Sequence, residues 1–147
     1  TAKYTDRTLP KPYNTNDDLD IFAQENVISN IPTSERLIMN ELEILSQNGE
    51  LIERLEIGQT GMLFSKVKNA IDFSQEFTYI VQIKNEDNNV ISLSWVTGET
   101  MPSQELGMSV SWMPQEPGKY SIERFVWNSI QGAIPLTDTI STDILIQ

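Results

Sequence analysis

The sequence predicts an all-β protein, a seven-stranded antiparallel sandwich over residues 37–147 that follows an irregular N-terminal extension over residues 1–36. Two observations lead to this fold class. Short segments alternate apolar and polar residues with a period of two, which is the pattern of strands that bury one face. Turn-forming residues separate these segments at short intervals, and no segment has a convincing helical pattern.

The clearest part of the pattern is the stretch from Leu106 to Trp127. Its first half alternates large apolar with small residues up to Trp112, then Pro114, Pro117 and Gly118 interrupt the chain. Alternation resumes at Tyr120, so the stretch predicts a strand, a corner and a second strand.

The other strands follow in order, with one alternative left open. Residues 37–45 alternate imperfectly, and their Met, Glu and Leu content also suits a helix. The Asn48-Gly49 pair that follows favours a hairpin-type turn and therefore a strand before it. The seven expected strands are 37–45, 62–68, 77–84, 90–96, 106–112, 120–127 and 136–146, with a loop at 97–105. In the fourth of them, Ile91, Leu93 and Trp95 share one face, so Trp95 is expected in the core together with Trp112.

The strand 120–127 contains a conflict between its two faces. Tyr120, Ile122 and Val126 share one face with Arg124, whereas Phe125 and Trp127 lie on the other. Both faces cannot belong to a single sandwich core. Either a bulge near Arg124 resets the register, or Phe125 and Trp127 form an outer apolar patch. Such a patch would be an interface or would lie under the N-terminal arm.

The extension 1–36 is rich in Pro, Asn and Asp, which argues against a long helix or a central strand. Its apolar residues gather in the segment Ile21–Ile31. Two interpretations remain: the segment packs back on the sandwich, or it is an arm that reaches a neighbouring subunit. The interface candidates are therefore Ile21, Phe22, Val27, Ile28, Ile31, Phe125 and Trp127.

Composition excludes several classes of function. The chain has no Cys and no His, so disulfides, thiol catalysis, thiolate zinc sites and histidine general bases are excluded. The net charge of −11 argues against nucleic acids and anionic membrane surfaces as partners, and no apolar run is long enough to insert into a membrane. Asp17, Asp18 and Asp20 lack the Gly and the later Glu of a calcium loop, so no metal or other cofactor is predicted.

The corner carries a resemblance to known modules. The segment Trp112-x-Pro114-x-x-x-Gly118-x-Tyr120 resembles a pattern of immunoglobulin-like and fibronectin type III-like sandwiches, in which the tyrosine hydroxyl bonds back to the upstream backbone. The strings 77–83 and 125–127 look similar to immunoglobulin-like modules of archaeal cell-surface proteins. The resemblance spans about residues 36–147. It implies an extracellular, non-catalytic module used for spacing, adhesion or assembly.

The functional prediction is therefore a secreted or cell-surface structural module that is not an enzyme. Its expected partners are like subunits or other surface proteins, bound by strand addition through the N-terminal arm. The alternative is a sandwich that binds a glycan or a small ligand. The loops at 97–105 and 129–135 contain no aromatic residue, which weakens the stacking platform that such a site needs.

Overall fold

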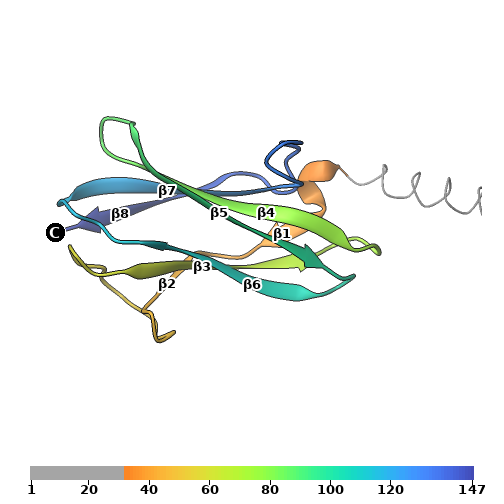
Figure 1. Cartoon of the computed structure of the whole chain (residues 1–147), viewed down its shortest axis with the longest axis horizontal. Helices are drawn as coiled ribbons and strands as arrows, with labels where there is room; N and C mark the ends of the chain where they lie inside the picture. The colour runs from red at the N-terminus through yellow and green to blue at the C-terminus, as the bar shows by residue number, and fades with distance from the viewer. Residues whose placement is uncertain (1–31) are drawn as a thin grey trace, which may run out of the picture. The chain divides into compact units, whose positions relative to one another are not determined.

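The computed structural model describes residues 32–147, in which two antiparallel sheets pack face to face as a sandwich (Figure 1). The predicted all-β sandwich is confirmed. A short 3-10 helix, η1 (Thr33–Glu35), precedes the strands. The strands are β1 (Leu37–Met39), β2 (Glu43–Leu45), β3 (Gly61–Asn69), β4 (Gln75–Lys84), β5 (Val90–Thr100), β6 (Glu105–Trp112), β7 (Gly118–Trp127) and β8 (Ile140–Ile146).

The first sheet is built around β3. β6 pairs with the whole length of β3 on one edge, and β1 and β2 share the other edge, one after the other. The predicted strand 37–45 is therefore divided in two, which gives eight strand segments instead of seven. The division lies at Asn40, whose backbone N–H donates to the Lys66 carbonyl while its side-chain oxygen accepts from the Lys66 N–H. This side chain replaces a regular ladder contact and lets the chain step from β1 to β2 along one edge.

The second sheet has the order β5-β4-β7-β8, so β5 and β8 are its edge strands. β5 continues to Thr100, and the predicted loop at 97–105 shrinks to residues 101–104. β8 begins at Ile140, later than the expected start at Leu136. The two sheets place their apolar faces against each other around β3, β4 and β7, which supply most of the fully buried side chains.

The prediction that Trp95 lies in the core is wrong. Trp95 is 52% exposed on the outer face of β5, whereas Trp112 is 8% exposed and belongs to the core as expected. The inner face of β5 carries small residues instead, because the Phe77 ring occupies the space beside them. A Cβ atom at Gly98, the cross-strand partner of Phe77, would lie only 2.9 Å from the Phe77 Cζ atom. β5 alternates as predicted, but the face that points inward is the opposite of the expected one.

The predicted corner after β6 is confirmed. The Tyr120 hydroxyl donates a hydrogen bond of 2.8 Å to the Glu116 carbonyl, back along the chain. The Tyr120 ring meets Trp112 edge-on, with 5.2 Å between ring centroids. The hydrogen bond and the ring contact together fix the angle at which the chain crosses from one sheet to the other.

The predicted turn at Asn48-Gly49 is confirmed too. The Ser46 N–H donates to the Glu50 carbonyl, and Gly49 has a φ of +87°, which only glycine adopts without strain. The turn lets Leu51 form an isolated bridge with Leu45, so the chain reverses direction after β2.

Candidate functional site

The outer face of the second sheet carries a row of large apolar side chains, here called the apolar face. It consists of Leu93 and Trp95 from β5, Ile80 from β4, and Phe125 and Trp127 from β7. Ile80 lies opposite both Trp95 and Phe125 in the register and is only 2% exposed, because these two rings flank it. The Phe125 and Trp127 rings lie 5.2 Å apart between centroids and are tilted by 45°. The apolar face is thus one packed surface rather than a set of scattered residues.

This arrangement settles the conflict between the two faces of β7. The register of β7 with β4 continues past Arg124 to Trp127 without a shift, and buried and part-buried residues alternate throughout β7, so the interpretation with a bulge is wrong. Phe125 and Trp127 form an outer apolar patch, as the second interpretation predicts, because both side chains project outward while Arg124 projects into the core. Their role as an interface stays a prediction.

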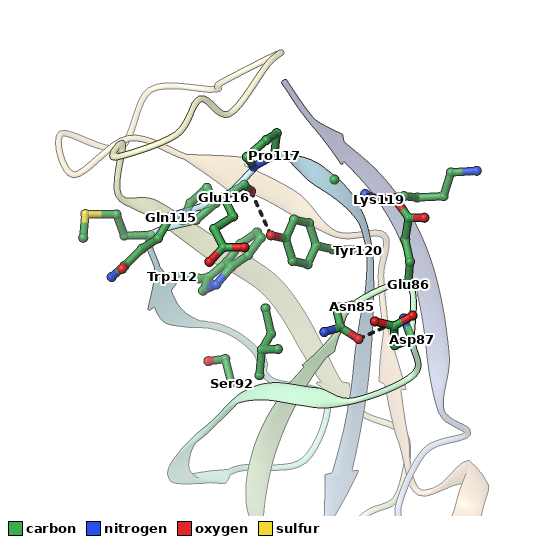
Figure 2. Close-up of a pocket in the computed structure, with 14 residues that line it drawn as sticks. Asn85, Glu86, Asp87, Ser92, Trp112, Gln115, Glu116, Pro117, Lys119 and Tyr120 are labelled. Atoms are coloured by element: carbon green, nitrogen blue, oxygen red, sulfur yellow. Dashed lines mark hydrogen bonds between the residues drawn. The ribbon is translucent and has the colours of Figure 1, made fainter.

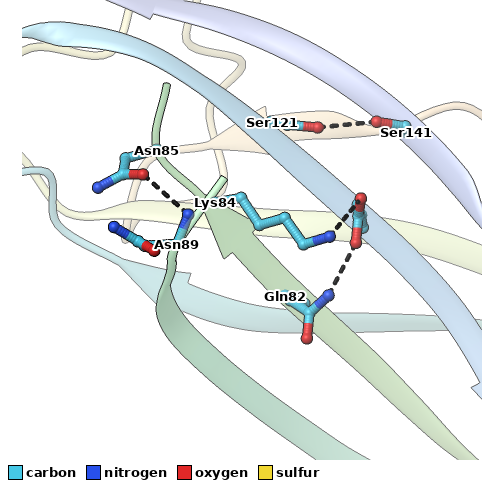
Figure 3. A network of polar contacts seen from close by, with 7 residues as sticks. Gln82, Lys84, Asn85, Asn89, Ser121 and Ser141 are labelled. Atoms are coloured by element: carbon cyan, nitrogen blue, oxygen red, sulfur yellow. Dashed lines mark hydrogen bonds and ion pairs between the residues drawn. The ribbon is translucent and has the colours of Figure 1, made fainter. Parts of the chain in front are cut away.

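Polar side chains on β4, β7 and β8 form an ion pair and hydrogen bonds with one another beside the apolar face (Figure 3). The Lys84 Nζ atom lies 3.4 Å from Glu123 Oε2, and the Gln82 side-chain amide donates to Glu123 Oε1 over 2.8 Å. The Ser121 and Ser141 hydroxyls share a hydrogen bond of 2.8 Å. The charge of Glu123 is therefore balanced within the molecule, and the neighbouring apolar face carries little net charge.

The edge strand β5 continues the apolar face to the end of the sheet. Its eleven residues contain one charged side chain, Glu99, and neither Lys nor Pro. Natural proteins protect exposed sheet edges with such residues, since an unprotected edge pairs with other strands. Within residues 32–147, β5 pairs only with β4, so its second edge takes part in no strand pairing.

Arg124 is the largest fully buried side chain of the described residues, with 1% of its surface exposed. Its Nη1 atom donates to the Asn40 carbonyl over 3.0 Å and to the Ser65 hydroxyl over 2.6 Å. The Ser65 hydroxyl also shares a hydrogen bond of 2.9 Å with the Tyr79 hydroxyl. Burial lowers the pKa of Arg124 and raises the pKa of Tyr79. Both directions follow from the cost of holding a charge away from water.

A cavity of about 450 Å³ lies beside Arg124, where the first sheet meets the edge of the second. The connection between β1 and β2 forms one wall, and β8 forms the other. The lining residues are Met39, Asn40, Glu41, Leu42, Arg124, Ile140 and Thr142. We call it the seam cavity.

A larger cleft of about 640 Å³ lies at one end of the sandwich, between the turn after β4 and the connection from β6 to β7 (Figure 2). Asn85, Glu86, Asp87 and Glu116 place polar side chains around it. Much of this polarity is used within the fold, since Glu86 accepts a hydrogen bond of 3.0 Å from the Lys119 N–H. Trp112 and Tyr120 line the cleft but are largely buried, so they present little ring surface to a ligand.

Several predicted sites lie outside the described residues. The interface candidates Ile21, Phe22, Val27, Ile28 and Ile31 belong to this part of the chain, as does the acidic group Asp17, Asp18 and Asp20. Between residues 32 and 147 no three acidic side chains come together so that they could hold a metal ion. In the same part of the chain no helix has the length and apolar character needed to cross a membrane.

Sequence reasoning missed two features of the described surface. It assigned Leu93 and Trp95 to the core, although the small residues Ser92, Ser94 and Gly98 on the opposite face of β5 were a usable signal. It also missed the seam cavity, because that cavity joins residues from β1, β7 and β8 that lie far apart in the sequence.

The chain matches no protein-family model, and no curated protein matches it. Solved structures resemble it in fold. The C-terminal domain of wzt has 12% identity and a TM-score of 0.63, over 77% of this chain and 74% of that chain. A CARDB domain from Pyrococcus furiosus, solved in complex with di-metal ions, has 16% identity and a TM-score of 0.53, over 76% of this chain and 87% of that chain.

A β-glucuronidase from Bacteroides uniformis is similar over a small part of its length, with 13% identity and a TM-score of 0.59, over 74% of this chain and 14% of that chain. At these identities the likeness concerns the fold alone. The finer resemblance to fibronectin type III modules and archaeal cell-surface modules stays a prediction. The chain has an immunoglobulin-like β-sandwich fold, and the CARDB and wzt domains that it resembles are β-sandwiches as well.

Proposed function

We propose that this protein is a non-catalytic extracellular module that assembles with further copies of itself at a cell surface. The apolar face and the open β5 edge carry this proposal. Exposed apolar side chains that pack into one continuous surface are typical of protein interfaces rather than of solvated sheet faces. Trp and Phe are also among the residues enriched in interface cores.

Charge favours a second copy as the occupant of the apolar face. The chain has a net charge of −11, so two copies repel each other over most of their surfaces. The β5 edge carries a single charge, Glu99, and the nearby Glu123 is balanced by Lys84. Two copies that meet through this face bring few like charges into direct contact, so the repulsion is smaller there than elsewhere. A twofold contact would use the same patch on both copies.

The proposal includes strand addition by the N-terminal arm. An arm that adds to a sheet edge of the next copy makes backbone hydrogen bonds for affinity and uses alternate side chains for specificity. Such a head-to-tail contact does not use the same patch on both partners, so it generates rings or filaments.

The test of the assembly proposal is the mass of the full chain in solution. We expect the double variant Leu93→Ser/Trp95→Ser to weaken self-association by about 2 kcal/mol, or about 30-fold in Kd, because it removes two large apolar anchors. Sedimentation equilibrium over a range of protein concentrations measures this change.

The matched control is Ile38→Ser, which removes an equally exposed apolar side chain from β1 in the other sheet. We expect this variant to associate like the parent. A parent chain that stays monomeric at all concentrations, or a double variant that associates as well as the parent, would contradict the proposal.

The alternative function, binding of a glycan or small ligand, would use the end cleft. The polar rim of this cleft favours the alternative. The burial of Trp112 and Tyr120 weighs against it, because neither ring offers a stacking surface.

A further inference from the structure

The seam cavity contains the buried guanidinium of Arg124, which forms no salt bridge with a carboxylate of residues 32–147. The carboxylate of Glu41, on the cavity wall, acts on its charge without direct contact. Both hydrogen bonds from Nη1 of Arg124 end on neutral acceptors, and its Nε atom is buried without a partner among the described residues. Buried charges in proteins are normally paired, because an unpaired one loses its hydration without compensation. The cavity beside Arg124 is therefore suited to receive a carboxylate.

The walls of the seam cavity also restrict which segment could bind there. Met39, Leu42 and Ile140 give it apolar surface on both sides of Arg124. β8, which forms one wall, is an edge strand of its sheet, so a further strand can hydrogen-bond along it. The cavity thus suits an extended segment in which one carboxylate is flanked by apolar residues on the same face.

One segment of this protein has that pattern. In an extended conformation Ile21, Ala23, Glu25 and Val27 would share one face, and Gln24 and Asn26 would lie on the other. Glu25 is the single charged residue of the segment Ile21–Ile31. Its neighbours two positions away, Ala23 and Val27, match the apolar surface on either side of Arg124.

We propose that the seam cavity is the acceptor site for the segment Ile21–Ile31 of a neighbouring copy. The segment adds a strand beside β8, the Glu25 carboxylate pairs with the Arg124 guanidinium, and Ala23 and Val27 pack against the apolar walls. This inference rests on the proposed assembly function, of which it names the arm's binding site. The apolar face remains a separate contact with its own test.

The absence of native cysteines permits a direct test by disulfide formation in the full chain. Ile140 is the cross-strand partner of Arg124, so a strand that places Glu25 beside Ile140 brings residue 23 or residue 27 beside Thr142, depending on its direction. We expect either Ala23→Cys/Thr142→Cys or Val27→Cys/Thr142→Cys to link chains covalently in a glutathione buffer, first as dimers and then as longer oligomers, because the contact is head-to-tail. Gln24→Cys/Thr142→Cys is the control, since residue 24 would face away.

The proposed ion pair between Glu25 and Arg124 is tested by adding charge substitutions to the cysteine variant that forms the disulfide. We expect Glu25→Gln to lower the yield of covalently linked chains by about tenfold or more, the range of close charge pairs at interfaces. Asp20→Asn removes a carboxylate just outside the segment, so we expect it to have little effect. Glu41→Gln should raise the yield, because Glu41 lines the cavity and repels an incoming carboxylate.

Three outcomes would overturn the inference: no disulfide in either pair, a disulfide within one chain instead of between two, or a yield that Glu25→Gln leaves unchanged. The disulfide readout does not depend on the apolar face. A lower mass of the assembly in Leu93→Ser/Trp95→Ser therefore tests the contact through the apolar face. The presence or absence of the disulfide tests the seam cavity as the binding site of the arm.

Discussion

At the scale of single residues, the cluster of Tyr79, Ser65 and Arg124 shows how the core holds polar groups. The three side chains form a connected chain of hydrogen bonds at the centre of the sandwich. The Nη1 atom of Arg124 donates to the Ser65 hydroxyl and to the Asn40 carbonyl. These hydrogen bonds link β7 to the β1–β2 connection of the other sheet. A buried network of this kind fixes the relative position of two sheets, which apolar packing alone leaves less specific.

This cluster predicts a pH dependence of stability. Burial raises the pKa of Tyr79 above its ordinary value of 10.0. The folded protein therefore holds this proton more tightly than the unfolded chain does. The resulting stabilisation is fully present below about pH 10 and is lost as the pH rises through the folded-state pKa. Burial lowers the pKa of Arg124, and this shift acts with the opposite sign at more strongly alkaline pH.

The measurement is urea denaturation of the parent and of Tyr79→Phe between neutral pH and about pH 11. We expect the parent to lose more stability over this range than the variant, because the variant has no phenol to ionise at position 79. Tyr120→Phe is the control, since Tyr120 bonds a backbone carbonyl at the corner and lies outside the cluster. Equal losses in the parent and in Tyr79→Phe would contradict the assignment.

At the scale of strands, β5 is organised by the Gly98–Phe77 pair. The aromatic ring lies against a glycine on the neighbouring strand, an arrangement that compensates for the missing side chain. The Phe77 ring leaves room only for small side chains beside it on the inner face of β5. The large side chains of β5 therefore lie on the outer face. The apolar face is thus a consequence of how β4 and β5 pack inside.

The pair predicts the effect of added volume. We expect Gly98→Ala to destabilise the fold by about 1–3 kcal/mol, because the new Cβ atom would meet Phe77 Cζ at 2.9 Å. In the background of Phe77→Leu, which removes the ring, we expect the same substitution to cost much less. A double-mutant cycle by chemical denaturation measures the coupling. Additive effects of the two substitutions would contradict this account of β5.

At the scale of the whole molecule, charge and apolar surface act against each other. The net charge of −11 makes copies repel each other, whereas the apolar face would draw them together in the proposed assembly. Salt shifts this balance, because it screens the repulsion between exposed charges and leaves apolar contact intact.

We therefore expect self-association to strengthen as ionic strength rises from about 0.01 M to about 1 M, over which the Debye length falls from about 30 Å to about 3 Å. Sedimentation equilibrium at several salt concentrations checks this. The variant Leu93→Ser/Trp95→Ser should gain less from salt than the parent, because it lacks the apolar contact. An assembly that dissociates with rising salt would be held by surface ion pairs and would contradict the proposed contact.

The sequence by itself determined the fold class, most strand positions and the corner at Tyr120. These features depend on local alternation and on turn residues such as Pro117 and Gly118, whose effects are confined to a few neighbouring positions. It also placed Phe125 and Trp127 correctly among the residues that do not fit a single core. This followed because Arg124 and Phe125 cannot both face inward in a regular strand.

Only the tertiary structure decided which face of β5 is buried. Alternation gives two faces without saying which one meets the core, and that choice depends on the Phe77 ring of the neighbouring strand. The seam cavity likewise needed the tertiary structure, since Asn40, Arg124 and Thr142 come together only when the edges of the two sheets meet. Contacts between residues so distant in the chain leave no periodic signal in the sequence, because periodicity reports local geometry alone.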